Sequence, residues 1–260
     1  FEDLKKKVTK KTKMILVENP GSITFEFQDL SKIVNLAKKK KIYTLLDNTW
    51  GTPLYLQPLK LGFDMSFSSA TKYFSGHSDA MGGSLAVNKK VFKKVMFFYK
   101  LSGYRMSADE AYLIIRGLRT LDTRLKQHYE STKIVINFLK KQKKIKEILY
   151  PHKTSSKNYK LWKKYYSGAT GLFSIVIKSK KKSNVIRFVN SLELFGIGYS
   201  WGGFESLAIL QELRASKDEY SQGRRFFRFN KDEHIVRLHI GLEDPKDLIF
   251  DLKNSLKYIK

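Results

Sequence analysis

The feature that most constrains the fold is an alternation of strand-like and helix-like segments over residues 13–47. Residues 13–18 form a short apolar run that ends at a proline and a glycine, which cannot continue a strand. Residues 29–41 begin with a capping aspartate, Asp29, and place four apolar side chains at helical spacing, Leu30, Ile33, Val34 and Ala37. Residues 43–47 form a second apolar run. This strand, helix and strand order predicts a right-handed parallel crossover and therefore an α/β sheet.

The remaining segments predict two domains. Two further strands are expected at residues 65–70 and 83–87, and Ser107 with Glu110 forms a capping box that begins a helix towards Gly117. Beyond residue 120 a new alternation begins, with strands expected at 171–178 and 235–240 and helices at 121–139, 183–194 and 246–258. We therefore expect residues 1–120 to belong to a large α/β domain and residues 121–260 to form a smaller α+β domain.

Composition excludes several classes of protein. With 42% hydrophobic residues in 260, the chain can bury a sizeable core, and no apolar segment has the length of a membrane helix. It has no cysteine, which fits a reducing compartment such as the cytoplasm and leaves no thiolate site. The formal charge of +26 suggests a polyanion partner, but the lysines are scattered in short runs without a nucleic-acid-binding motif. We expect neither a nucleic-acid nor a membrane partner.

Polar side chains stand at the ends of two predicted strands. Asp47 ends the strand at 43–47, and Ser69, Thr71 and Lys72 stand at and just beyond the end of the next one. In α/β sheets ligands bind at this edge. A lysine there can form a Schiff base, the hydroxyl groups can donate to a phosphate, and an acid can hold a pyridinium nitrogen protonated. Together these groups predict a site for pyridoxal 5'-phosphate.

Arg237 lies in the otherwise apolar run at 235–240. A buried arginine is costly unless it is paired, so this one either meets a structural carboxylate or awaits an anionic ligand such as a substrate carboxylate. His234 and His239 are five residues apart in the same predicted strand and would face opposite sides, which disfavours a shared metal. We expect no metal site.

Four motifs together carry a resemblance to a known family. They are Asp47-Asn48-Thr49-Trp50, Ser69-Ala70-Thr71-Lys72-Tyr73, residues 76–81 (GHSDAM) and residues 116–121 (RGLRTL). The chain resembles the Cys/Met-metabolism family of pyridoxal phosphate enzymes along essentially its whole length. A fifth segment, residues 199–207 (YSWGGFESL), is similar to the branch that cleaves cystathionine by β-elimination, as is Trp50.

The resemblance implies a fold, an activity and an assembly. The fold is that of aspartate aminotransferase (fold type I), a mixed, mostly parallel sheet with a smaller α+β C-terminal domain. Lys72 would bind the cofactor and act as the catalytic base, with Asp47, Ser69 and Thr71 as further cofactor-binding residues. Ser200, Trp201 and Arg237 would bind the carboxylate of L-cystathionine, which is split into homocysteine, pyruvate and ammonia in methionine biosynthesis. A homotetramer of active dimers is implied.

Two alternatives remain open. The first is another branch of the same family, a gamma-lyase, gamma-synthase or sulfhydrylase. The second is a basic nucleic-acid-binding protein with a decayed site. The chain begins without methionine, and relatives in the family have well over a hundred further residues before this point, so we expect a C-terminal fragment whose cofactor contacts are incomplete.

Overall fold

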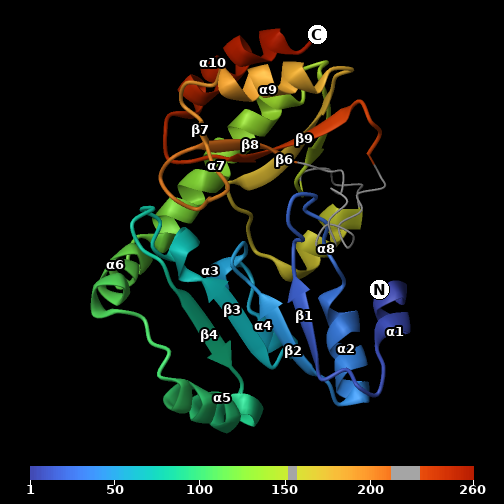
Figure 1. Cartoon of the computed structure of the whole chain (residues 1–260), viewed down its shortest axis with the longest axis vertical. Coiled ribbons are helices and arrows are strands. Elements are labelled where there is room, and N and C mark those ends of the chain that lie inside the picture. The colour runs from blue at the N-terminus through green and yellow to red at the C-terminus, as the bar shows by residue number, and fades with distance from the viewer. Residues whose placement is uncertain (152–156, 212–228) are drawn as a thin grey trace. The chain divides into compact units, whose positions relative to one another are not determined.

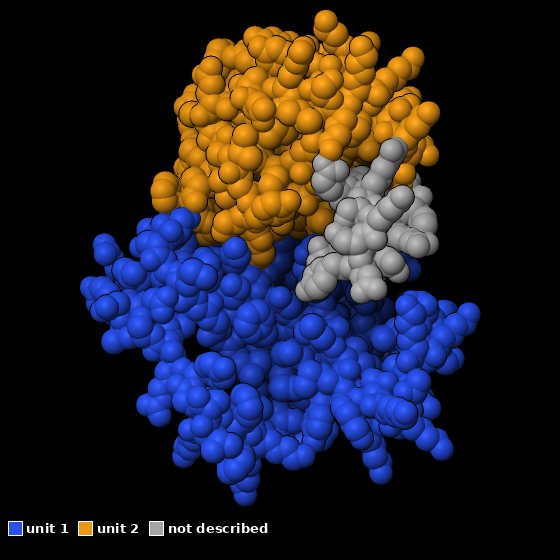
Figure 2. All heavy atoms as spheres, in the orientation of Figure 1, with its two compact units in different colours: residues 1–22, 26–122, 151–169 blue, residues 23–25, 123–150, 170–260 orange. Residues whose placement is uncertain are grey.

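The computed structural model describes residues 1–151, 157–211 and 229–260 (Figure 1). These residues form two compact units (Figure 2). Unit 1 comprises residues 1–22, 26–122 and 151–169, and unit 2 comprises residues 23–25, 123–150 and 170–260. The main part of unit 1 ends at residue 122, close to the expected boundary at residue 120. Unit 1 also includes residues 151–169. The assignment of domains to 1–120 and 121–260 stays a prediction.

The sheet of unit 1 has four strands in the order β1-β2-β3-β4. They are β1 (Met14–Glu18), β2 (Tyr43–Asp47), β3 (Met65–Ser69) and β4 (Gly83–Val87). The first three are parallel and β4 is antiparallel to β3. The predicted α/β class with a mixed, mostly parallel sheet is therefore confirmed. Because β1, β2 and β3 run the same way, their carboxyl ends lie at one edge of the sheet.

The helices of unit 1 are mostly short and follow local signals. They are α1 (Glu2–Lys7), α2 (Leu30–Lys40), α3 (Thr52–Tyr55), α4 (Pro58–Leu61), α5 (Lys89–Ser102), α6 (Ala108–Leu118) and α8 (Lys157–Tyr165), with a single π-type turn, η1 (Ala70–Phe74). In α2 the buried residues are the four predicted from the spacing, and Asp29 caps the helix by accepting from the amide of Lys32. Ser107 likewise caps α6 through the amide of Glu110.

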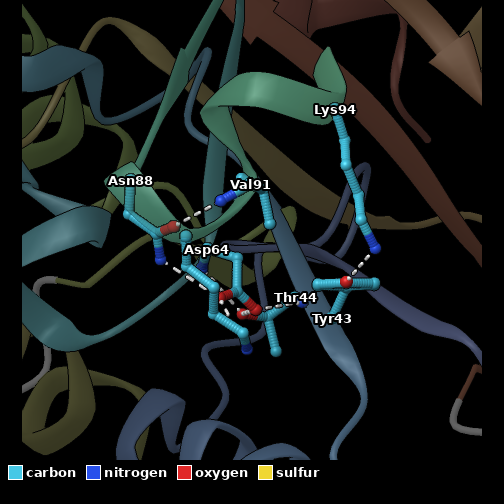
Figure 3. A network of polar contacts seen from close by, with 7 residues as sticks. Tyr43, Thr44, Asp64, Asn88, Val91 and Lys94 are labelled. Atoms are coloured by element: carbon cyan, nitrogen blue, oxygen red, sulfur yellow. Dashed lines mark hydrogen bonds and ion pairs between the residues drawn. The ribbon is translucent and has the colours of Figure 1, made fainter.

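A polar network holds the opposite edge of this sheet together (Figure 3). The carboxylate of Asp64, just before β3, accepts from the amide of Thr44 at 3.0 Å and from the side-chain amide of Asn88 at 3.1 Å, and it faces the ammonium of Lys90 at 3.5 Å. Lys94 donates to the hydroxyl of Tyr43 at 3.0 Å. One buried carboxylate thus joins the start of β2, the start of β3 and the segment between β4 and α5.

Unit 2 has a five-stranded sheet in the order β5-β6-β9-β8-β7. Its strands are β5 (Ile145–Leu149), β6 (Leu172–Lys178), β7 (Gly196–Ile197), β8 (Leu207–Gln211) and β9 (Glu233–His239). The central strand β9 is antiparallel to both β6 and β8, and β7 is parallel to β8. The helices are α7 (Leu121–Leu139), α9 (Lys182–Asn190) and α10 (Pro245–Ser255), followed by the short 3-10 helix η2 (Leu256–Tyr258). Figure 1 shows α9 and α10 side by side.

One helix of unit 2 ends earlier than the sequence predicted. The pattern extended it to residue 194, but α9 ends at Asn190. The reason is a tertiary contact, because the carboxylate of Asp251 in α10 accepts from the amides of Glu193 at 3.0 Å and Leu194 at 2.9 Å. Across the ranges that the structure describes, every helix is too short or too polar to cross a lipid bilayer.

Candidate active site

The structure brings the predicted cofactor residues of unit 1 to one edge of its sheet. Asp47 is the last residue of β2 and Ser69 is the last residue of the neighbouring parallel strand β3. Lys72 lies in the π-type turn η1 that directly follows β3. Asp47, Ser69, Thr71 and Lys72 are all half-buried. This is the edge at which open α/β sheets bind their ligands.

A threonine that the sequence analysis did not single out links two of these residues. The carboxylate oxygen Oδ1 of Asp47 accepts from both the amide and the hydroxyl of Thr49, at 2.9 and 2.5 Å. The hydroxyl oxygen of Thr49 in turn accepts from the amide of Ser69 at 2.9 Å. Thr49 is buried, so these contacts are shielded from water. They fix the orientation of the Asp47 carboxylate and join the ends of β2 and β3.

The remaining polar atoms of Asp47 and Ser69 are available to a ligand. Oδ2 of Asp47 and the hydroxyl of Ser69 make no hydrogen bond with residues 1–151, 157–211 or 229–260. Thr71 differs, because its hydroxyl donates to the carbonyl of Gly82 at 3.3 Å and accepts from the amide of Gly82 at 3.0 Å. In this structure Thr71 therefore ties η1 to the start of β4.

Helix α6 packs closely against the segment that carries Lys72. The backbone of Lys72 has φ −92° and ψ −127°, so it departs from helical geometry within η1. Phe74 and Ser75, two and three residues after Lys72, present carbonyl oxygens to Gly117 of α6, and a Cβ atom built on Gly117 would lie 2.4 and 2.2 Å from them. Only a glycine allows this approach. The motif at 116–121 thus has a physical role, which is to let α6 pack on the turn behind Lys72.

Trp50 packs in the core of unit 1, and His77 lies at its surface. Trp50 is buried in an aromatic cluster with Phe27 and Tyr166, at ring-centroid distances of 5.9 and 5.7 Å, in edge-to-face geometry. It is a core residue of unit 1. His77 is exposed, and its Nδ1 lies 2.6 Å from the carbonyl oxygen of Ser75.

The predicted substrate residues lie in unit 2. Arg237 is half-buried in β9, and its guanidinium donates to the carbonyl oxygen of Tyr199 and lies 5.9 Å from the centroid of the Tyr199 ring. Burial lowers the pKa of Arg237, and Tyr199 acts in the opposite direction. Within residues 1–151, 157–211 and 229–260, no carboxylate pairs with Arg237. A partly desolvated guanidinium without a described acid is suited to an anionic ligand.

Ser200 and Trp201 lie in the loop that connects β7 to β8, with Ser200 exposed and Trp201 half-buried. The end of this loop is anchored by Glu243, whose carboxylate accepts from the amide and the hydroxyl of Ser206 at 2.7 and 2.8 Å. The hydroxyl oxygen of Ser206 also accepts from the amide of Gly241 at 2.8 Å. Ser206 of the motif at 199–207 is therefore a structural anchor, bound to the segment that follows β9.

The residues present in unit 1 fit pyridoxal 5'-phosphate. A carboxylate with one oriented and one available oxygen, a hydroxyl without a described partner, and a lysine beyond the same strand ends are the groups that this cofactor needs. The fold and these groups define the class of pyridoxal phosphate enzymes with the aspartate aminotransferase fold.

A family model described as "Cys/Met metabolism PLP-dependent enzyme" matches residues 1–257, and the chain belongs to this family. Pyridoxal 5'-phosphate is therefore its cofactor.

Three known proteins illustrate the range of similar activities. The chain is 38% identical over 256 residues to the L-alanine/L-glutamate racemase of Wolbachia pipientis wMel, covering 98% of the chain and 62% of that protein. It is 37% identical over 253 residues to cystathionine beta-lyase MetC of Escherichia coli K12, covering 96% and 63%. It matches the structure of cystathionine gamma synthase from Xanthomonas oryzae pv. oryzae with a TM-score of 0.85 and 29% identity, covering 95% and 63%. The chain thus spans less than two thirds of each of these proteins.

Some functional residues were missed at the level of sequence. Thr49 was quoted only as part of a motif, although a hydroxyl two residues after an aspartate is a known signal for a local side-chain turn. Gly117 was likewise quoted only as part of a motif and as the end of a helix, and its packing role has no local signal because its close neighbours are some 40 residues away in sequence.

Proposed function

We propose that the chain is the greater part of an enzyme that cleaves L-cystathionine by β-elimination, giving homocysteine, pyruvate and ammonia, in cytoplasmic methionine biosynthesis. The observation that carries this proposal is Arg237, a guanidinium with no described carboxylate partner that contacts the Tyr199 end of the loop bearing Ser200 and Trp201. An amino-acid substrate has a carboxylate that a guanidinium grips with two parallel hydrogen bonds. The similarity to the E. coli beta-lyase supports the same activity.

The residues of unit 1 would hold the cofactor and move one proton. Lys72 is the residue that would bind it covalently, and Asp47 would keep its ring nitrogen protonated. Ser69 would donate to its phosphate, and Thr71 would do so by turning its hydroxyl hydrogen away from the carbonyl of Gly82. When bound, the cofactor withdraws electrons from the substrate α-carbon. Lys72 would remove the proton from that carbon, which requires the neutral amine, because an ammonium group cannot accept a proton. Thr49 keeps the Asp47 carboxylate oriented throughout.

The residues of unit 2 would orient the substrate. Arg237 would bind its carboxylate together with Ser200 and Trp201. An elimination needs the bond to the leaving sulfur held perpendicular to the plane of the conjugated system. A fixed carboxylate supplies one of the anchor points for that alignment.

We also propose that the protein assembles as a homotetramer of active dimers. Supporting this, unit 1 exposes several large apolar side chains on and beside α5, among them Phe97 at 70%, Phe98 at 64%, Leu101 at 74% and Tyr104 at 78% exposure. An apolar surface of this kind is typical of an interface between protein subunits. Analytical ultracentrifugation tests the proposal, which a monomeric holoenzyme would contradict.

The decisive experiment traps the cofactor and identifies the product. Borohydride reduction of the holoenzyme followed by peptide mapping should place the adduct on Lys72, and an adduct on another lysine would contradict the assignment. Cystathionine should then yield pyruvate. Substantial 2-oxobutyrate would instead favour the gamma-lyase branch. Binding to nucleic acid that survives rising salt, without any adduct, would favour the nucleic-acid alternative.

Racemisation is the second candidate function, because a racemase is among the similar proteins. The first step is the same, since Lys72 would remove the α-proton in both reactions. The outcomes differ, because a racemase returns a proton to the opposite face of the α-carbon instead of expelling the β-sulfur. Formation of D-alanine from L-alanine without pyruvate from cystathionine would favour this activity.

A further inference from the structure

Two side chains of the central strand β9 contact the loop between β7 and β8. Arg237 and His239 are two residues apart in β9, so both project from the same side of the strand. His239 is 1% exposed, which places its ring inside unit 2. The loop carries Ser200 and Trp201, and it leads into β8, the neighbour of β9 in the sheet.

The two side chains contact the loop on either side of Ser200 and Trp201. Arg237 donates to the carbonyl oxygen of Tyr199. The imidazole Nε2 of His239 accepts from the amide of Gly202 at 3.0 Å and lies 3.2 Å from the carbonyl oxygen of Gly203. Nε2 without a proton binds the Gly202 amide, and Nε2 with a proton would bind the Gly203 carbonyl. In either form this nitrogen contacts the backbone of the Gly202-Gly203 segment.

The turn at Gly202 depends on this contact. Gly202 has φ +87°, a backbone conformation that side-chain-bearing residues rarely adopt, and the residue is buried. A buried amide needs an acceptor, because an unsatisfied buried donor is costly. His239 supplies that acceptor from β9.

The ring of His239 is itself held by a second histidine. His128 of α7 lies with its ring centroid 5.2 Å from that of His239, and its Nδ1 is 2.7 Å from the carbonyl oxygen of Ile240. Burial lowers the pKa of His128 to about 4, and the charge of Arg124 acts in the same direction. His128 is therefore neutral near pH 7 and packs against His239 without placing a charge beside it.

We propose that His239 is a positioning residue that holds the backbone of the Gly202-Gly203 segment and thereby fixes Ser200 and Trp201 relative to Arg237. The part that concerns substrate rests on the proposed function, because the loop and Arg237 together form the proposed carboxylate site. The part that concerns the loop rests on the contacts of β9 alone. His239 touches neither cofactor nor substrate in this proposal, and its effect on the reaction is transmitted through the loop.

The test uses three substitutions of His239 and one matched control. In His239→Gln the side-chain amide reaches the position of Nε2 and offers both a donor and an acceptor. In His239→Asn the shorter amide lies near the position of Nδ1 and cannot reach the peptide, and His239→Leu removes all hydrogen bonding. The control is His234→Leu, in the same strand, whose Nε2 contacts the carbonyl of Ser179 instead.

Tryptophan fluorescence reports the loop without any need for activity. Trp50 and Trp162 are 5% and 8% exposed, whereas Trp201 is half-buried, so changes in acrylamide quenching report Trp201. The same substitutions made in a Trp201→Phe protein should leave quenching unchanged, which checks that the signal comes from Trp201. We expect the quenching constant of the holoenzyme to rise about twofold in His239→Leu and His239→Asn, because a loop freed from its anchor opens to solvent. His239→Gln and His234→Leu should match the wild type.

The kinetic arm uses cystathionine. Loss of one buried hydrogen bond should raise KM about tenfold in His239→Leu and His239→Asn with a smaller change in kcat, and His239→Gln should restore KM to within about threefold. Unchanged quenching in both His239→Asn and His239→Leu would overturn the proposal, as would a His239→Gln variant that behaves like His239→Leu. If His239→Leu does not fold, the quenching constants and KM values of His239→Asn and His239→Gln are compared instead.

A wild-type protein that does not cleave cystathionine would refute the proposed function and leave the quenching result intact.

Discussion

Replacing Gly117 by alanine tests whether the approach of α6 fixes the turn that carries Lys72. The added Cβ would lie 2.2 Å from the carbonyl oxygen of Ser75, whereas real Cβ atoms stay beyond 3.0 Å, so the two segments must separate by 0.8 Å. Overpacking lowers the free energy of unfolding by about 1–3 kcal/mol. We expect the upper end of this range here, because the added Cβ meets two backbone oxygens that cannot rotate away. The better helix propensity of alanine returns about 1 kcal/mol. We expect a net loss of roughly 2 kcal/mol in the free energy of unfolding.

The assays are thermal unfolding and turnover per bound cofactor. For a chain of this size, roughly 2 kcal/mol corresponds to a fall of about 4–8 °C in Tm. Turnover should fall further than stability alone requires, because displacement of a catalytic group by about 1 Å can cost about a hundredfold. Gly21→Ala is the matched control in unit 1, since its new Cβ would meet nothing closer than 3.9 Å. A Tm equal to that of the wild type would refute the packing argument, and a lower Tm with normal turnover would refute its link to Lys72.

Three further substitutions have defined outcomes. Asp47→Asn should reduce turnover at least about a hundredfold while the absorbance of bound cofactor persists, because a neutral amide does not stabilise a protonated ring nitrogen; near-normal turnover in a loaded variant is the contrary result. Arg237→Lys should raise KM about tenfold with cofactor still bound, because the two-pronged geometry is lost; unchanged KM with a lower Tm would instead indicate a structural arginine. Asp64→Asn should lower the free energy of unfolding in denaturant by about 1–3 kcal/mol at pH 7. Although burial opposes it, hydrogen bonds from Asn88 and Thr44 and the charge of Lys90 lower the pKa of Asp64 below 3.8, so this stability is present above pH 3.8 and is lost as the pH falls through the lowered value. An equal difference between the two proteins at pH 2 and pH 7 would refute that account.

Local signals predicted most elements of the fold, because a helix cap or a strand end is decided within a few residues. Asp29, Ser107 and Asp244 each cap the predicted helix by accepting from a backbone amide two or three residues later. The strands at 14–18 and 43–47 became parallel neighbours, as the strand, helix and strand order required. The sequence placed Asp47, Ser69 and Lys72 at or just beyond strand ends, and the parallel pairing of β2 with β3 brings these ends to one edge of the sheet.

The sequence by itself therefore determined the α/β class, the family motifs and the strand ends at which the cofactor residues lie. The tertiary structure decided the contacts between segments that are distant in the chain. Thr49 joins Asp47 to the amide of Ser69, α6 packs on the turn behind Lys72 through Gly117, and His239 holds the peptide at Gly202. These contacts depend on strand register and on atomic packing, and neither leaves a periodic or local pattern in the residues that make them.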